Sequence, residues 1–158
     1  MSTEGLSAEQ NASRGYTITR VLSASRERVW DAWTKPEQFA IWFGGHQCRM
    51  EDMLMDVRPG GDWSGTMVLP DGTSTISWRG HFLELDHPSR LVLDFTDQGA
   101  EGKEFDSFTV TLTTLSPNET QMVVRQSGGH LTDEQYKEAE KGTGMFMDVL
   151  AEMIAGDV

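Results

Sequence analysis

The sequence is poor in cysteine, in basic residues and in long apolar runs, and each deficit excludes a class of protein. Cys48 is the only cysteine, so an internal disulfide and a multi-cysteine metal site are both excluded. Only 13 Lys and Arg stand against 25 Asp and Glu, which gives a net charge of −12. Such a surface repels nucleic-acid phosphates and anionic lipid. We therefore expect neither nucleic acid nor a membrane as a partner.

The apolar runs are too short for a membrane protein. No stretch approaches the roughly 18 residues of a membrane span, and the first residues lack the hydrophobic core of a signal peptide. The default expectation is a soluble, cytoplasmic protein. Residues 1–14 are rich in Ser, Glu, Gly and Asn, which predicts a flexible N-terminal tail. Residues 15–158 are expected to form a single domain, which is long enough to bury a core.

What the sequence does contain is one long amphipathic segment near its end. Apolar or small residues recur three and four apart from 132 to 155, which predicts a helix of about 24 residues. Thr132 or Asp133 would supply the N-cap oxygen. Gly142 and Gly144 interrupt this helix, and each costs about 1 kcal/mol relative to alanine. A helix that keeps them needs either a close backbone approach or empty space beside it.

Upstream of this helix, the pattern indicates one strand, two short helices and about six more strands. Residues 16–22 alternate as a strand does, Ser23 or Ser25 can cap a first short helix, and Pro36 can start a second. Further strands follow, separated by turns at 59–61, 70–73, 87–89 and 116–118, and these turns make neighbouring strands antiparallel. The predicted fold class is α+β, with a curved antiparallel sheet of six or seven strands wrapped on the long C-terminal helix.

Several of these segments resemble one known family. Residues 29–37 and Trp42-Phe43 are similar to the opening helices of the START-like (SRPBCC) superfamily. The D-x-R-P-G-G block at 56–61 and the P-D-G at 70–72 resemble the branch named after the activator of the heat-shock-protein-90 ATPase. The similarity covers roughly Tyr16 to Ala155. It implies a helix-grip fold, in which a hydrophobic cavity between sheet and C-terminal helix holds small apolar or amphipathic molecules.

One position departs from the family pattern. The family often has a tryptophan just after the glycine of the closing helix, and here that position is Thr143. The smaller side chain would enlarge or reshape the space beneath the helix.

Aromatic and methionine side chains are the candidates for lining such a cavity. Nine methionines and five tryptophans are many for this length, and methionine adapts to varied apolar shapes. All of these residues could instead simply pack the core, and both interpretations stay open. The candidate ligand-binding residues are Trp42, Trp63, Met67, Trp78, His81, Phe82, Phe95, Phe146, Met147 and Leu150.

Polar anchors for a ligand are harder to choose. Glu84 shares strand parity with Trp78 and Phe82, so it is either a partly buried carboxylate or, beyond a β-bulge, exposed. The four histidines lack H-x-x-x-H spacing, so neither a metal nor another cofactor is expected. Cys48 beside His46 is favoured as a structural cysteine over a Cys–His nucleophile. Candidate anchors are His81, Arg79, Glu84, Arg125 and His46.

Three classes of function stay open. The first is a protein that binds a small hydrophobic molecule in the cavity, as a monomer or a homodimer. The second is a cyclase- or hydrolase-like enzyme that uses His81 or Glu84 in the same cavity, although no catalytic motif such as G-x-S-x-G occurs. The third is an interaction module that acts on a chaperone, which is the activity that the branch's name suggests.

Overall fold

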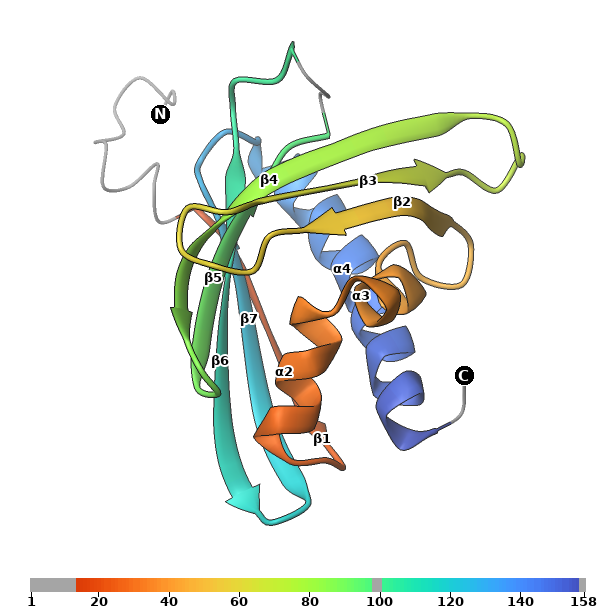
Figure 1. Cartoon of the computed structure of the whole chain (residues 1–158). Helices are drawn as coiled ribbons and strands as arrows, with labels where there is room; N and C mark the ends of the chain where they lie inside the picture. Colours follow the sequence, from red (N-terminus) through yellow and green to blue (C-terminus); the bar gives the residue numbers. More distant parts are fainter. Residues whose placement is uncertain (1–13, 98–100, 157–158) are drawn as a thin grey trace.

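A seven-stranded antiparallel sheet with the order β1-β7-β6-β5-β4-β3-β2 forms the frame of the molecule (Figure 1). The computed structural model describes residues 14–97 and 101–156, so the predicted tail, apart from Arg14, lies outside the described residues. The strands are β1 (Gly15–Leu22), β2 (Arg49–Met55), β3 (Asp62–Val68), β4 (Thr75–Asp86), β5 (Arg90–Phe95), β6 (Asp106–Ser116) and β7 (Glu119–Ser127).

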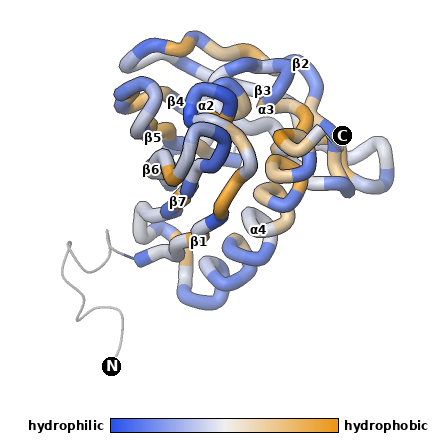
Figure 2. The backbone as a smooth tube through the Cα atoms, turned by 90° about the horizontal axis from the view of Figure 1, so that it is seen from below, coloured by the Kyte–Doolittle hydropathy of each residue, from blue (hydrophilic) through white to orange (hydrophobic). Residues whose placement is uncertain are grey.

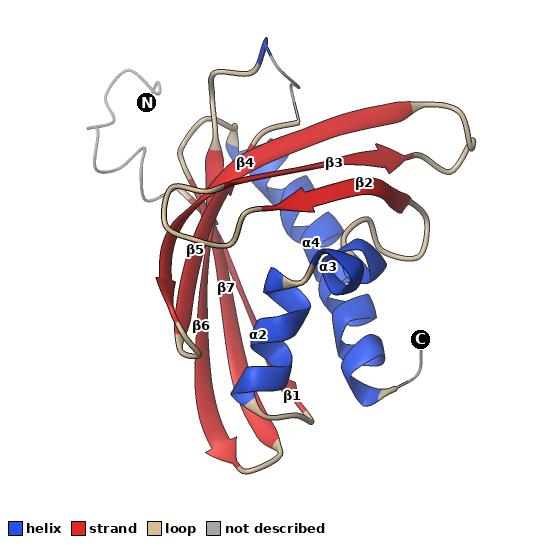
Figure 3. Cartoon of the chain, in the orientation of Figure 1, coloured by secondary structure: helices blue, strands red, loops and turns tan. Residues whose placement is uncertain are grey.

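Three helices lie inside the bend of this curved sheet (Figure 3). They are α2 (Arg26–Thr34), α3 (Pro36–Trp42) and α4 (Asp133–Ala155). Ser25 caps α2, where its side chain accepts a hydrogen bond from the backbone N–H of Arg28 at 3.3 Å. Thr132 and Gln135 form a capping box at the start of α4, so Thr132 is the N-cap. The predicted fold class, α+β with a long closing helix, is confirmed.

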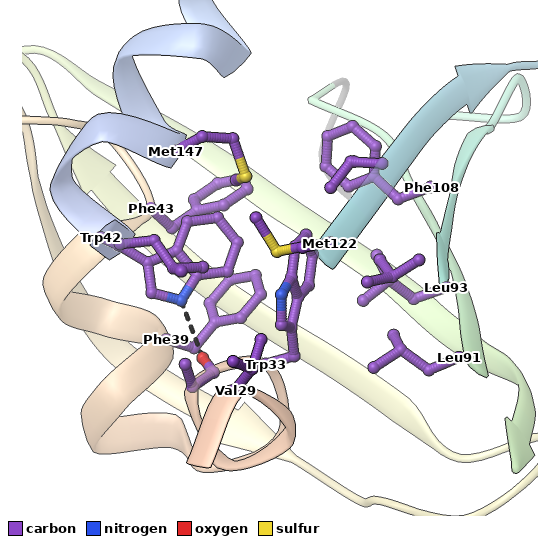
Figure 4. Close-up of a cluster of buried hydrophobic side chains, with 14 of the residues drawn as sticks. Val29, Trp33, Phe39, Trp42, Phe43, Leu91, Leu93, Phe108, Met122 and Met147 are labelled. Carbon is purple, nitrogen blue, oxygen red and sulfur yellow. Dashed lines mark hydrogen bonds between the residues drawn. The ribbon is translucent and has the colours of Figure 1, made fainter. Parts of the chain in front are cut away.

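The interior beneath α2 and α3 is filled by aromatic rings (Figure 4). Trp33, Phe39 and Trp42 are almost fully buried, and their ring centroids lie 4.6–6.5 Å apart. The indole N–H of Trp42 donates to the backbone carbonyl of Ala32 at 2.7 Å. Met147 reaches this cluster from α4. This end of the interior is therefore a packed core.

Polar and apolar residues alternate along α4 (Figure 2), as expected of a helix with one face against a sheet. Its buried residues are Tyr136, Thr143, Met147, Val149, Leu150 and Met153.

Within the described ranges, every helix is too short or too polar to cross a lipid bilayer.

Candidate functional site

A cavity of about 270 Å³ lies between the middle of α4 and the sheet. Its wall draws on β4, β5, β6 and β7, on α4, on the segments that flank these elements, and on Phe43 at the end of α3. The volume is just below the range of about 300–1,000 Å³ that small-molecule pockets usually have. A cavity of this size suits a small compact molecule better than a long-chain lipid.

Five aromatic rings of the wall form a continuous series, which we call the aromatic arc. Successive ring centroids lie 5.1, 5.3, 6.0 and 4.6 Å apart, within the range of favourable aromatic contacts. The arc therefore gives the cavity a broad apolar and polarisable surface. In order, its members are Phe146, Phe43, Trp78, Phe95 and Phe108.

The two glycines of α4 differ in what surrounds them. A Cβ atom added at Gly142, which lines the cavity, would meet no heavy atom within 4 Å. A Cβ atom added at Gly144 would lie 3.8 Å from the guanidinium of Arg20. Of the two explanations that the sequence left open, empty space is therefore the one that holds at Gly142.

Opposite the arc, four polar side chains form a chain of hydrogen bonds that joins α4 to the sheet. The Tyr16 hydroxyl of β1 donates to Gln126 Oε1 of β7, and it therefore accepts from the Thr143 hydroxyl of α4 at 2.6 Å. Gln126 Nε2 in turn donates to Asp106 Oδ2 at 2.8 Å. We call Thr143, Tyr16, Gln126 and Asp106 the polar chain. Three of its members line the cavity, namely Thr143, Gln126 and Asp106.

The polar chain ends at Asp106, since Thr143 donates to Tyr16, Tyr16 to Gln126, and Gln126 to Asp106. This carboxylate is only 7% exposed. The Tyr136 hydroxyl also hydrogen-bonds to it, in a geometry too poor to satisfy Oδ1. A Cβ atom at position 128 would lie 2.1 Å from Oδ1, so Gly128 leaves the room that the carboxylate occupies. A buried acceptor without a partner costs about 1–3 kcal/mol. The site thus holds a carboxylate with unused capacity to accept hydrogen bonds.

Burial also controls the two tyrosines near this carboxylate. It raises the pKa of the Tyr16 hydroxyl well above its usual range, and the hydrogen bond from Thr143 offsets only part of that shift. The pKa of Tyr136 is raised too, first by burial and then by the negative charge of Asp106 and a hydrogen bond to that carboxylate. Both tyrosines are therefore neutral at physiological pH and act there as hydrogen-bonding groups.

Three further ionisable side chains line the cavity where it meets solvent. Asp97, Glu104 and His130 are all exposed. In the part of the chain that the structure describes, no three His, Cys, Asp or Glu side chains gather closely enough to hold a metal ion.

The family can be assigned from comparison with known proteins. The family model described as Activator of Hsp90 ATPase homolog 1-like protein matches residues 23–155, which is most of the chain. This protein belongs to that family. The resemblance seen in the sequence is thereby confirmed. A search of curated protein sequences gave no match.

Solved structures share the fold of this family member at low sequence identity. Protein CV1439 from Chromobacterium violaceum is 23% identical, with a TM-score of 0.77, and the match covers 89% of this chain and 96% of that one. Protein NE0264 from Nitrosomonas europaea is 24% identical, with a TM-score of 0.76 and coverage of 96% and 98%. A protein from Arthrobacter aurescens is 22% identical, with a TM-score of 0.77 and coverage of 90% and 86%. Likeness at this level shows a common fold alone.

The structure brings some of the predicted ligand-binding residues to the cavity and places the rest elsewhere. Trp78, Phe95 and Phe146 line it. His81 lies outside the lining, and its Nδ1 is 2.9 Å from Asp94 Oδ1. The others are buried in the hydrophobic core and are not part of the lining: Trp42, Trp63, Met67, Phe82, Met147 and Leu150. Ligand contact by any of these residues stays a prediction.

The other candidate anchors also lie outside the cavity lining. A register shift between Phe82 and Glu84 turns Glu84 to the surface, where it pairs with Arg90 at 3.2 Å. The bulge interpretation of Glu84 is therefore the correct one. The remaining anchors contact other residues of the protein. His46 lies 2.7 Å from Glu152, Arg79 donates to the Gly102 carbonyl at 2.6 Å, and Arg125 donates to Thr17 at 3.2 Å.

The residues of the site that sequence reasoning missed include Phe43, Phe108, Asp106 and Gln126. Strand parity contains a signal for three of them. Asp106 shares the parity of the buried residues of β6, and Gln126 shares that of β7, so both are polar residues at core positions. Phe108 follows Asp106 on the same face. A polar residue at a core position on each of two adjacent strands predicts a buried polar pair.

Proposed function

We propose that this protein binds a small amphipathic molecule in the cavity between α4 and the sheet. The observation that carries this proposal is the aromatic arc beside open space at Gly142. Small-molecule pockets are mostly apolar, with a few polar groups that orient the ligand, and the polar chain supplies such groups here. The family assignment supports the proposal, since the START-like fold is consistent with ligand binding.

The enzymatic alternative named His81 and Glu84 as the reacting groups. Both side chains lie outside the cavity lining, and each pairs with a neighbour on the sheet, Asp94 and Arg90 respectively. The geometry therefore favours binding over a reaction at these two residues. Activation of a chaperone is an activity in the family's printed name, and no contact described here adds support for it.

The proposal is tested by blocking the cavity with one side chain. Gly142→Leu places a side chain in the open space, whereas Gly144→Leu adds the same group to the same helix outside the cavity lining. Binding of indole, naphthalene and their simple derivatives is measured by isothermal titration calorimetry. We expect Gly142→Leu to weaken binding by about tenfold or more, which corresponds to about 1.4 kcal/mol. Gly144→Leu is expected to keep the original affinity.

Two results would contradict the proposal. One is the failure of every small aromatic or apolar probe to bind the folded protein. The other is an equal loss of affinity in the two variants, because the effect would then come from the helix and not from the cavity.

A further inference from the structure

We propose that the cavity selects a cationic amphiphile, an aromatic or alicyclic amine, over a carboxylate of the same shape. This inference rests on the proposed function and adds to it the charge of the ligand. Three observations lead to it: the rings of the aromatic arc, the buried Asp106 carboxylate, and the negative charge of the other ionised residues that line the cavity.

The aromatic arc places several aromatic rings beside the cavity. An ammonium group over the face of an aromatic ring is attracted by the ring quadrupole, and tryptophan is the best partner. Trp78 is in the middle of the arc, with Phe43 and Phe95 on either side at centroid distances of 5.3 and 6.0 Å. Several rings around one space form the kind of cage that binds alkylated ammonium groups.

Asp106 supplies the opposite charge. Its carboxylate lines the cavity and is 7% exposed. It accepts one well-formed hydrogen bond, from Gln126, and a weaker one from the Tyr136 hydroxyl. An ionised carboxylate can accept about four hydrogen bonds, and a buried one is costly unless it is paired. The polar chain holds this group in place through Gln126, which Tyr16 and Thr143 hold in turn. A protonated amine would provide a further donor and the missing positive charge.

The remaining charges of the wall have the same sign as Asp106. Asp97 and Glu104 are exposed residues of the cavity lining. None of the described lining residues is Lys or Arg. His130 is the one lining side chain that can become positive, and it is exposed too. A carboxylate ligand would therefore enter against like charges and meet no buried cation, which is unfavourable at short range.

The test compares three probes that share a phenyl group and a short linker: phenethylamine, phenethyl alcohol and hydrocinnamate. They carry a positive, a neutral and a negative head group, and their affinities are measured by calorimetry at constant ionic strength. We expect the amine to bind most tightly and the carboxylate most weakly. Asp106→Asn is expected to lower the affinity for the amine by about tenfold or more, the size of a charge-assisted hydrogen bond.

Two further variants complete the test. Glu138→Gln removes an equal charge from the exposed surface of α4, outside the cavity lining, and is expected to leave all three affinities unchanged. Glu104→Gln neutralises an exposed residue of the cavity lining, where folding is not at risk, and is expected to lower the amine affinity by a smaller factor. It preserves the test if Asp106→Asn fails to fold, which circular dichroism would show.

The outcomes separate this inference from the proposed function. Equal affinities for the amine and the carboxylate, or a preference for the carboxylate, overturn the charge selection alone. An amine preference that survives both Asp106→Asn and Glu104→Gln also overturns it. If neither these three probes nor the neutral aromatic probes bind, the proposed function fails together with it.

Discussion

The two ends of the interior differ in how completely their tryptophans are packed. At the packed end, Trp42 and Trp63 are buried, and each indole N–H donates to a backbone carbonyl. At the end that contains the cavity, Trp78 is partly exposed. An indole N–H without a partner occurs at both ends, at Trp33 and at Trp78, so exposure is what separates them. About one turn of α4 separates these ends, since Thr143 faces the cavity and Met147 faces the core. One sheet therefore borders both a close-packed core and an open cavity.

The largest expected effect is a difference in stability between tryptophan variants at the two ends. Trp42→Ala should lower the free energy of unfolding by about 3–5 kcal/mol, because it leaves a cavity in close-packed surroundings. Trp78→Ala should cost clearly less, because this ring already borders empty space and has fewer partner atoms to lose. Urea unfolding followed by circular dichroism measures both. Equal losses would mean that the end that contains the cavity is as well packed as the core.

The next effect concerns the polar chain. Tyr16→Phe should lower the free energy of unfolding by about 1–3 kcal/mol, because Gln126 Oε1 and the Thr143 hydroxyl both lose their partner. Urea unfolding at neutral pH measures this loss. Thr17→Val is a control on the same strand, since the Thr17 side chain is exposed and lies outside the polar chain. A loss no larger than that of the control would show that the chain adds nothing to stability.

The same variant predicts a change in pH dependence. The pKa of Tyr16 is raised in the folded protein, so the unfolded chain releases this proton near pH 10 while the folded protein keeps it. The stabilisation is complete below about pH 10 and is lost as the pH rises further. Tyr16→Phe should therefore flatten the fall in stability between about pH 9 and about pH 11. An unchanged slope would contradict the burial of this hydroxyl.

The smallest effect is a gain in stability. Gly142→Ala and Gly144→Ala should each raise the free energy of unfolding by about 1 kcal/mol or less, because alanine favours the helix and neither Cβ atom meets an obstacle. Thermal unfolding measures the gain. A loss at Gly142 with a gain at Gly144 would show that the space beneath the helix is occupied.

Most of the fold could be predicted because its signals are local. The capping residues, the period of α4 and the tight turns each act over a few neighbouring residues. The turn at 70–73 is an example, since Asp71 accepts hydrogen bonds from the backbone N–H groups of Thr73 and Ser74 at 2.9 and 2.7 Å. Turns of this kind make adjacent strands antiparallel and account for the order from β2 to β7. The pairing of β1 with β7 joins distant segments and does not follow from them.

The site was harder to predict because its parts come from distant segments. Trp78 and Phe95 were found from strand parity, and Phe146 from the apolar stripe of the helix. Asp106 was missed because its neighbour Gln126 is 20 residues away in the chain, and only the pairing of β6 with β7 brings them together.

Strand parity predicts on which face of β4 a side chain lies, and His81 and Glu84 show two ways in which this prediction was misapplied. His81 has the opposite parity to Trp78 and Phe82, so alternation alone places it on the other face of β4. Glu84 has the same parity as they do, but the register shift before it reverses that placement.

The bond between Thr143 and Tyr16 has a consequence for how ligands of different size could fit. It fastens the centre of α4 to an edge strand, and the ion pair between Arg20 and Asp148 adds a second attachment about one turn further along. To lift or slide for a larger guest, the helix would have to break the buried Tyr16–Thr143 bond and the exposed ion pair. Adaptation is left to rotation of rings such as Phe146, and we expect the protein to accept a narrow range of molecular shapes.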